Sequence, residues 1–277
     1  MKVAVLTLTA AMLAVAPAAH ADTLIAPATG VQHVTAAGAT VAWAAPAGSR
    51  YRLVIDGEVA PIRSFATAPD ADLGSNAFTG QHVVAVYARN GDIYLYDPQT
   101  RTERKVPGAS TKAYRESAPS IANGNIAFVR RGGRRNGVYV TRRSGRVSRV
   151  DGHLARETAV SQSRVAFLYR NGAGQDDITI AQLDGGNRRL LARRTPGVLF
   201  SVQITRYKVG WLERTSAAVV ARQTKRINPS DRNPFVYAGK RALPATTTSA
   251  AIAHDRQFDV YADAEGVKRI SPPLFAG

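Results

Sequence analysis

Short apolar phrases recur along this chain at a nearly constant interval. Each phrase is a β-branched residue, then a small residue, then in most copies an aromatic one, and the six copies begin at Val41, Val84, Ile126, Val165, Val209 and Ile252. Successive copies lie 39 to 44 residues apart. Repeats of about 40 to 45 residues built from short strands are typical of β-propeller blades. The spacing therefore predicts an all-β protein, a six-bladed β-propeller of four-stranded antiparallel blades.

A second strand-like run follows each phrase and supports this prediction. These runs are rich in β-branched and aromatic residues and occupy residues 51–55, 93–96, 138–141, 178–181, 218–221 and 258–261. In three repeats an Asn-Gly pair lies between the phrase and the run, and this pair favours the tight turn of a hairpin. Each phrase and its run are therefore expected to form the central hairpin of one blade, with shorter runs on either side as the other two strands.

The first 21 residues have a different pattern. Lys2 supplies one positive charge, residues 3–16 are apolar, and Ala19-His20-Ala21 are residues that signal peptidase accepts. This predicts a secretory signal peptide over residues 1–21, cleaved before Asp22. A retained membrane helix is the alternative, but a bilayer requires roughly 20 apolar residues. We therefore expect a secreted or periplasmic protein without a membrane span in the mature chain.

The absence of cysteine limits the possible sites and anchors. The chain has no cysteine, so it cannot be a lipoprotein, and it has neither disulfides nor thiolate metal sites. Residues 22–277 are expected to form a single, monomeric propeller domain of six repeats of about 40–44 residues. The run Thr23-Leu24-Ile25 is expected to pair beside the sixth repeat, because this pairing would close the ring and remove an exposed sheet edge.

Positive charge is concentrated in the middle of the chain. There are 37 basic and 20 acidic residues, giving a net charge of +17, and eight arginines but no carboxylate lie between residues 130 and 149. Successive loops of a blade alternate between the two faces of a propeller, which separates the arginines at 131–135 from those at 142–146. The predicted basic patch on one face comprises Arg130, Arg131, Arg134, Arg135, Arg193 and Arg194. Arginine pairs bidentately with phosphate and carboxylate, which favours an anionic ligand; a solvated basic surface that keeps the protein soluble is the other interpretation.

One polar element also repeats in phase. Arg115-Glu116 and Arg156-Glu157 lie 41 residues apart, each just before a predicted innermost strand. Such pairs could bind a polar ligand at the mouth of the central channel. They could equally form salt bridges between blades.

Motifs for known catalytic chemistry are absent from the sequence. There is no Gly-x-Ser-x-Gly elbow, His-Glu-x-x-His, phosphate-binding loop or dinucleotide glycine signature. The histidines after residue 21 are in different repeats, without the local spacing of metal ligands. We therefore expect no catalytic residue, no metal and no cofactor. Sequence-specific nucleic-acid binding is not expected either, because the arginine-rich stretch lacks interleaved stacking residues and the chain is predicted to be exported.

The third repeat shows a family resemblance. It has a polar start, an Ala118-Pro119 step, a turn at Asn123-Gly124, an Ile-Ala-Phe strand at 126–128 and a Val-Tyr-Val strand at 138–140. This pattern resembles the WD40-like repeat of TolB-type six-bladed propellers, and the resemblance implies a propeller used as a binding scaffold. The favoured hypothesis is an exported, non-enzymatic binding or scaffold protein for a protein partner or an anionic extracellular polymer. The alternative is a lyase or hydrolase that acts on an extracellular polysaccharide or peptide at the channel mouth.

Overall fold

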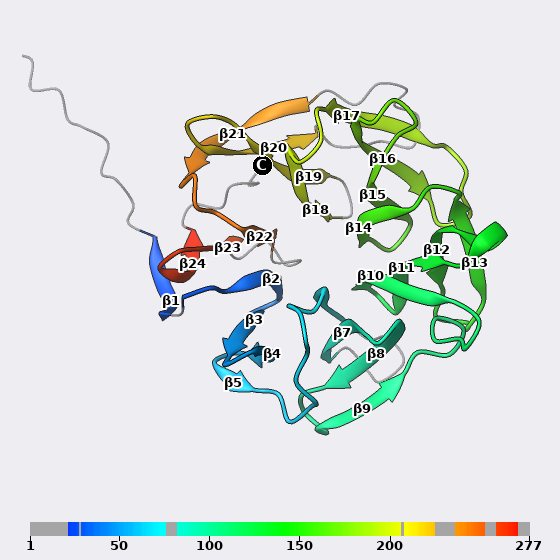
Figure 1. The fold of residues 1–277 in the computed structure, drawn as a ribbon, viewed down its shortest axis with the longest axis horizontal. Helices are drawn as coiled ribbons and strands as arrows, with labels where there is room; N and C mark the ends of the chain where they lie inside the picture. The colour runs from blue at the N-terminus through cyan, green and yellow to red at the C-terminus, as the bar shows by residue number, and fades with distance from the viewer. Residues whose placement is uncertain are drawn as a thin grey trace, which may run out of the picture.

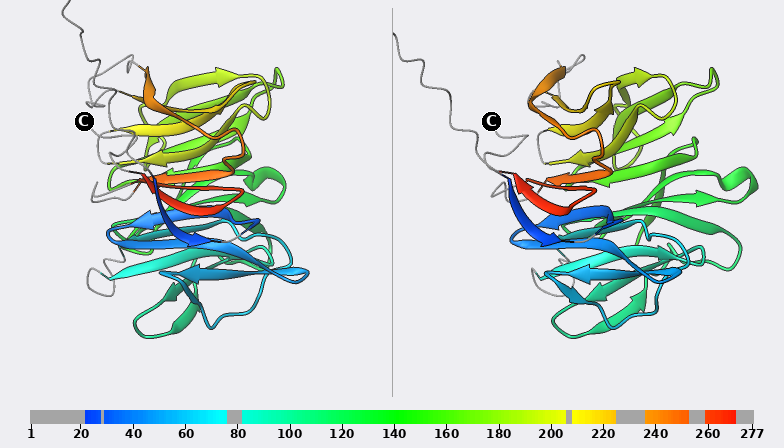
Figure 2. Two further views of the ribbon diagram at one scale, coloured as in Figure 1. Left: turned by 90° about the vertical axis from the view of Figure 1, so that its left-hand side faces the viewer. Right: turned by 60° about the vertical axis from the view of Figure 1, so that its left-hand side comes forward.

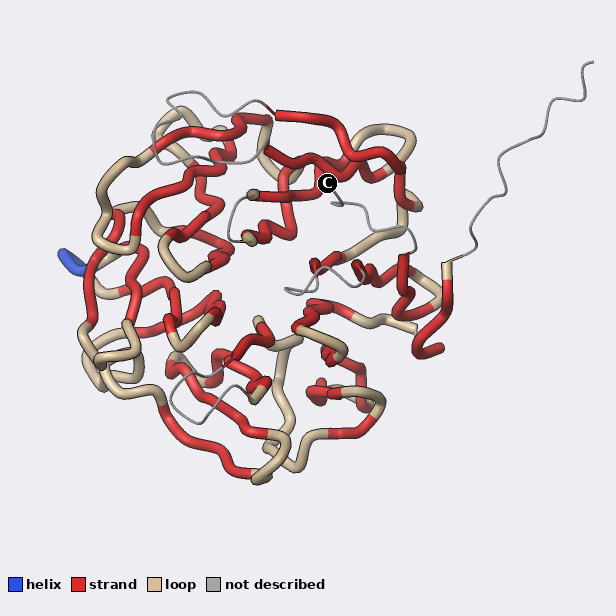
Figure 3. Tube along the Cα trace, turned by 180° about the vertical axis from the view of Figure 1, so that it is seen from behind, coloured by secondary structure: helices blue, strands red, loops and turns tan. Residues whose placement is uncertain are grey.

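Six four-stranded antiparallel sheets surround a central axis in the computed structural model of the chain (Figure 1). The structure describes residues 22–27, 29–75, 82–205, 208–224, 236–252 and 259–270. The predicted six-bladed β-propeller is confirmed, whereas the predicted signal peptide of residues 1–21 lies outside the described residues. The strands run between the two faces of the disc, and loops join them at both faces (Figure 2). Seen from behind, strands again form most of the ring and loops connect them (Figure 3). In the part of the chain that the structure describes, the one helical segment is the 3-10 turn η1 (Gly133–Arg135), and no helix is long and apolar enough to cross a membrane.

Each blade contains four strands in the same order from the channel outward. The inner strands are β2 (Gln32–Ala37), β6 (Ala71–Ser75), β10 (Arg115–Ala122), β14 (Ala155–Val160), β18 (Leu199–Ile204) and β22 (Ser249–Ile252). The second strands are β3 (Thr40–Ala47), β7 (Val83–Arg89), β11 (Asn125–Arg131), β15 (Arg164–Arg170), β19 (Val209–Arg214) and β23 (Asp259–Asp263). The third strands are β4 (Arg50–Ile55), β8 (Asp92–Asp97), β12 (Gly137–Thr141), β16 (Asp176–Gln182), β20 (Val219–Thr224) and β24 (Gly266–Ile270). The outer strands are β5 (Glu58–Val59), β9 (Thr102–Lys105), β13 (Val147–Asp151), β17 (Arg189–Arg194), β21 (Val236–Leu243) and, in the sixth blade, β1 (Thr23–Pro27).

The ring closes through the sixth blade. Its outer strand β1 comes from the beginning of the described chain and pairs antiparallel with β24, with Thr23 opposite Arg269 and Pro27 opposite Gly266. The Tyr261 hydroxyl donates a hydrogen bond of 2.9 Å to the Asp22 carboxylate beside this strand. The predicted pairing of Thr23-Leu24-Ile25 with the last repeat is therefore confirmed.

The hydrophobic core lies between the blades. Six apolar clusters form, one between each pair of neighbouring blades. Successive residues of a strand point to opposite faces of its sheet, so Ile126 and Phe128 pack towards the second blade and Ala127 towards the fourth. One large buried aromatic in each second strand packs against the preceding blade; these residues are Trp43, Tyr87, Phe128, Phe167, Trp211 and Tyr261. Burying each such side chain contributes roughly 2 to 3 kcal/mol.

The position of this aromatic residue shows that the sequence predicts the apolar phrase at the wrong place in two repeats. In the second repeat the predicted phrase begins at Val84, but the aromatic that packs on the first blade is Tyr87, so the equivalent phrase begins one residue later. In the sixth repeat Ile252 lies in the inner strand β22 instead of the second strand, which is β23 with Tyr261. The shift arises because the outer strand of the fifth blade extends to Leu243, so the inner strand of the sixth blade begins only at Ser249, later than the regular interval predicts.

Candidate functional site

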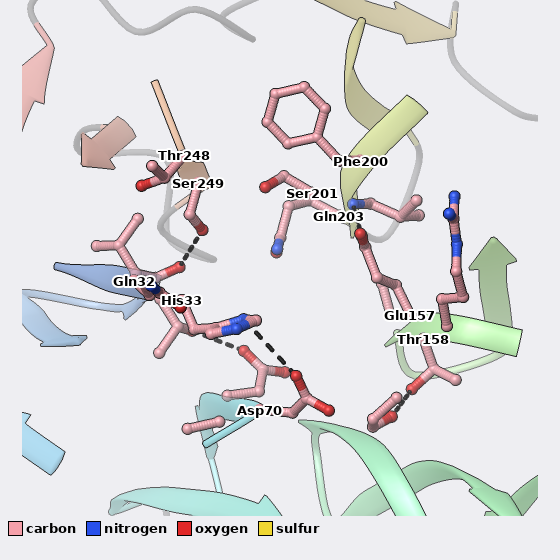
Figure 4. Close-up of a pocket in the computed structure, with 18 of the residues that line it drawn as sticks. Gln32, His33, Asp70, Glu157, Thr158, Phe200, Ser201, Gln203, Thr248 and Ser249 are labelled. Atoms are coloured by element: carbon pink, nitrogen blue, oxygen red, sulfur yellow. Dashed lines mark hydrogen bonds and ion pairs between the residues drawn. The ribbon is translucent and has the colours of Figure 1, made fainter. Parts of the chain in front are cut away.

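A cavity of about 570 Å³ lies inside the ring of inner strands (Figure 4). All six blades contribute to its wall, for example through Thr35, Asp72, Pro119, Thr158, Gln203 and Ser249. The cavity also reaches Gly197, in the link before β18, and Arg214, at the end of β19. It therefore opens towards the face on which inner strands begin and second strands end. Its volume is within the range of small-molecule sites.

Three residues in the cavity wall have a left-handed backbone conformation. They are His33 (φ 50°), Ala118 (φ 47°) and Ser201 (φ 51°), on the inner strands of the first, third and fifth blades. In each of these blades the pairing between inner and second strand is irregular at this point. A non-glycine residue in this conformation costs about 1 to 2 kcal/mol, and such strain concentrates at functional sites. The strained positions mark this cavity as the first candidate site.

Titratable side chains face each other across the cavity. The His33 Nδ1 atom lies 3.7 Å from the Asp70 carboxylate, and these side chains keep 44% and 42% of their surface exposed. On the opposite wall, the Glu157 carboxylate accepts a hydrogen bond of 2.8 Å from the backbone amide of Val202 in the next blade. Burial raises the pKa of the Glu157 carboxyl. An imidazole and two carboxyl groups, one of which has a pKa raised by burial, are therefore available in one cavity.

Hydrogen bonds between blades hold the cavity wall in place. The Asp72 carboxylate accepts hydrogen bonds from the Thr35 hydroxyl at 2.7 Å and from the backbone amide of Ile121 at 2.9 Å, so it joins the first three blades. The Thr158 hydroxyl donates to the Ala118 carbonyl oxygen at 2.6 Å. These hydrogen bonds between blades hold the wall in place. The Asp72 and Thr158 side chains use them to bond to the protein itself.

The predicted arginine patch divides into buried and exposed members. Arg130 is 6% exposed, and its Nε donates a hydrogen bond of 3.0 Å to the Glu116 carboxylate. Its guanidinium group also lies over the aromatic rings of Phe128 and Tyr139. It also donates a hydrogen bond to the Gly108 carbonyl oxygen. Arg130 and Glu116 therefore form a buried ion pair inside the third blade, and neither side chain reaches the predicted surface patch.

The exposed members form what we call the arginine loop, comprising Arg131 at the end of β11 and Arg134 and Arg135 in the turn before β12. The guanidinium groups of Arg131 and Arg134 form no hydrogen bond or ion pair with any residue that the structure describes. Arg115, also exposed, lies opposite Arg131 in the β10–β11 ladder. The Tyr114 ring lies against Gly132, where an added Cβ would approach it to 2.3 Å, and the Arg135 guanidinium lies 5.8 Å from this ring. Because β10 begins where β11 ends, the arginine loop is on the face towards which the cavity opens.

Arg193 and Arg194 have carboxylate partners. Arg193 forms two hydrogen bonds with Asp177, at 2.7 and 2.8 Å, and this contact holds the pKa of Asp177 below its usual range. Arg194 donates to Glu213 at 2.8 Å. Burial would raise the pKa of Glu213, but hydrogen bonds from Arg194 and Arg222 lower it overall. The charge of Arg193 and Arg194 is therefore largely balanced within the fourth and fifth blades.

The two Arg-Glu elements have different environments. Arg156 and Glu157 both line the cavity, and Arg156 pairs with Asp176 at 2.7 Å. Arg115 is at the surface and Glu116 is buried against Arg130, and neither of them lines the cavity. In neither element do the adjacent arginine and glutamate pair with each other within the described chain; their side chains instead join different strands or blades.

No sequence signal predicts that His33, Asp70 and Gln203 belong to one site. Each lies on or just before a different inner strand, and no local motif contains more than one of them. Only the closed ring brings them together. Over the described ranges, no group of three or more histidine, aspartate or glutamate side chains is arranged to hold a metal ion.

Comparisons with known proteins identify the fold. No protein-family model matches the sequence, and no curated protein matches it. Among solved structures, TolB from Acinetobacter baumannii is similar at a TM-score of 0.53 and 14% identity, over 78% of this chain and 56% of that one. The chain thus spans little more than half the length of that TolB.

Two further structures match over more of their length. The WD40 repeats of RRP9 give a TM-score of 0.56 at 12% identity, covering 87% of this chain and 79% of that one. A gluconolactonase from Xanthomonas campestris gives a TM-score of 0.59 at 17% identity, covering 89% and 87%. The matches include TolB and WD40 propellers, in agreement with the resemblance of the third repeat. At these identities they show that the chain has the β-propeller fold.

Proposed function

We propose that this protein is an exported, monomeric, non-enzymatic propeller that binds an anionic extracellular polymer through the arginine loop. One observation carries the proposal. Arg193, Arg194, Arg130 and Arg156 are each paired with a carboxylate, whereas Arg131 and Arg134 extend from a loop and make no ion pair within the described residues. Export rests on the predicted signal peptide over residues 1–21.

The chemistry of the loop supports a polyanion. Guanidinium groups pair with phosphate, sulfate and carboxylate through two parallel hydrogen bonds. Arg115 and Arg131 on adjacent strands and Arg134 in the following turn place several such groups along one edge. A polymer with repeated negative charges can contact them together and release its counterions, and this release makes binding strongly dependent on salt. A single small anion contacts fewer of these groups and releases fewer counterions, so its binding free energy is much smaller.

Replacing Arg131 and Arg134 together by alanine is expected to weaken binding to heparin, used as a polyanion probe, by about tenfold or more near 100 mM salt. The slope of log affinity against log salt should fall by about two, one for each lost contact. The matched control is Arg143→Ala with Arg146→Ala, which removes the same charge from exposed positions in the turn before β13. Equal losses in both double variants, or binding unaffected by salt, would contradict the proposal. Binding to an acidic protein but not to heparin or polyglutamate would identify a protein partner instead.

A second candidate function is supported by the cavity. A lyase or hydrolase acting on an extracellular polysaccharide or peptide needs an acid and a base at one site, and Glu157 and the His33–Asp70 pair offer them. The likeness to a gluconolactonase, at 17% identity, is compatible with an enzyme on this fold. Fold alone does not determine function.

Glu157→Gln distinguishes this second candidate from the first. If the cavity is catalytic, the wild-type protein should cleave a member of a panel of chromogenic glycosides, uronate polymers and peptide anilides. Glu157→Gln should then reduce turnover by about 100-fold or more, while Glu58→Gln, at an exposed site in the first blade, should leave it unchanged. If the wild-type protein turns over no substrate of the panel, the second candidate function is ruled out.

A further inference from the structure

We propose that the cavity inside the ring is a binding site for a neutral, polyhydroxylated ligand of the size of a disaccharide. The site is separate from the arginine loop and the inference does not depend on either proposed function. It follows from the balance of charges in the cavity wall, from the hydrogen-bonding groups left over, and from the shape of the cavity.

Every charged group in the wall already has a partner. Asp72 accepts hydrogen bonds from Thr35 and Ile121, and Glu157 accepts one from Val202 while burial favours its neutral form. On the cationic side, Arg156 pairs with Asp176, and Arg214 donates to the carbonyl oxygens of Ala245 and Thr247 at 3.1 and 3.4 Å. Asp70 and His33 lie close to each other. Apart from Glu157, the wall holds carboxyl groups (Asp70 and Asp72) and guanidinium groups (Arg156 and Arg214) in equal number, so a ligand with a net charge of either sign would meet like charge as well as opposite charge.

Several polar side chains of the cavity wall can still form hydrogen bonds with a ligand. The Gln203 side chain lines the cavity and has no hydrogen-bond partner among the residues that the structure describes. One oxygen of the Asp70 carboxylate lies near the Nδ1 atom of His33, and neither the second oxygen nor the Nε2 atom of His33 has a side-chain partner among the described residues. An amide and a carboxylate are planar groups with two adjacent polar atoms. They match the paired hydroxyl groups of a sugar ring.

Phe200 adds an apolar surface beside these polar groups. Its ring lines the cavity (Figure 4). The Arg214 guanidinium lies 5.0 Å from the centroid of this ring. An aromatic ring next to convergent polar groups suits a ligand with an apolar C–H face and a polar edge. The volume of about 570 Å³ accommodates more than one sugar ring.

The strained backbone supports a role in binding over one in folding. His33 and Ser201 hold left-handed conformations in the wall, and the bulges at these residues displace the inner strands from regular pairing. Strain of this kind persists only where the surrounding structure enforces it, and it is concentrated at ligand sites. A channel filled only by packed aliphatic side chains would not require it.

The experiment is calorimetric titration of the full mature chain with maltose, cellobiose, lactose, trehalose and di-N-acetylchitobiose at up to about 10 mM. At least one neutral disaccharide is expected to bind. Digalacturonic acid and the glucosamine dimer, as anionic and cationic probes of the same size, are expected to bind at least about tenfold more weakly. Failure of all five disaccharides to bind, or tighter binding of either charged sugar, overturns the proposal.

Substitutions locate the binding site. Gln203→Ala is expected to lower the affinity for the disaccharide by about tenfold, because one hydrogen-bonding group is lost. Gln99→Ala removes the same side chain from an exposed turn of the second blade and should leave the affinity unchanged. Since Gln203 has no internal partner in the described chain, its replacement should leave the melting temperature of the free protein unchanged, while the ligand-induced rise in that temperature should shrink. Equal affinity of Gln203→Ala and the wild type would place the sugar elsewhere and overturn the proposal.

Discussion

Replacing Arg130 by methionine is expected to lower the free energy of unfolding by about 3 to 5 kcal/mol. The Arg130 side chain is 7% exposed and that of Glu116 is fully buried. Methionine fills much of the same space but leaves the Glu116 carboxylate without its cationic partner. A buried charge without a partner is far more costly than the intact pair. Urea unfolding followed by circular dichroism measures the difference.

The double variant Arg130→Met with Glu116→Leu is the control for this explanation. Burial raises the pKa of Glu116 even though hydrogen bonding to Arg130 lowers it, so desolvation is the larger effect. Replacing both partners with apolar residues removes that penalty. The double variant should therefore be at least about 2 kcal/mol more stable than Arg130→Met alone. A double variant as unstable as the single one would mean that the loss comes from packing and not from the unpaired carboxylate.

The stability difference between the wild type and Arg130→Met should depend on pH. In Arg130→Met the folded-state pKa of Glu116 rises further above its unfolded value. A carboxyl group with a raised folded-state pKa destabilises the fold at pH values above its unfolded pKa, and this effect disappears as the pH falls and the group is protonated in both states. The stability difference between wild type and Arg130→Met should therefore narrow from pH 7 to about pH 5. A constant difference would also argue for packing.

Arg130 shows why the sequence could predict the fold but only part of the basic patch. The recurrence of strand phrases depends on local alternation, so it predicts six blades without knowledge of distant contacts. The pairing of an arginine depends on which carboxylate the fold brings beside it. Glu116 lies 14 residues from Arg130 and reaches it across the β10–β11 pair. No local feature separates Arg130 from its exposed neighbour Arg131.

The cavity was unpredictable for a related reason. His33, Asp70, Glu157 and Gln203 come from four blades and share no spacing within the chain. Their convergence depends on closure of the ring, and the orientation of His33 and Ser201 depends on bulges that shift the strand register. In the second repeat the sequence predicts the apolar phrase one residue too early, because Val84-Ala85-Val86 and Ala85-Val86-Tyr87 both suit a buried strand. Only the packing of Tyr87 against the first blade distinguishes the two registers.

Deleting residues 22–27 is expected to lower the free energy of unfolding by about 3 to 5 kcal/mol. The deletion removes the β1–β24 ladder and the hydrogen bond from Tyr261 to Asp22. A net backbone hydrogen bond contributes about 0.5 to 1.5 kcal/mol, and Ala26 also packs against the apolar cluster between the sixth and first blades. The truncated sixth blade would expose the edge of β24, and an open edge favours association between chains.

Thermal unfolding and size-exclusion chromatography measure both consequences of this deletion. Leu24→Lys is the control within the same strand, because Leu24 is 47% exposed, and it should change stability by no more than about 0.5 kcal/mol. A synthetic peptide of residues 22–29 should restore the melting temperature of the truncated protein in a concentration-dependent way, because it can add to the open edge of β24. A truncated protein that remains monomeric and as stable as the wild type would show that three strands suffice in the sixth blade. Ring closure would then depend on contacts between the inner strands β22 and β2, where the Ser249 hydroxyl donates to the Val34 carbonyl oxygen at 3.5 Å.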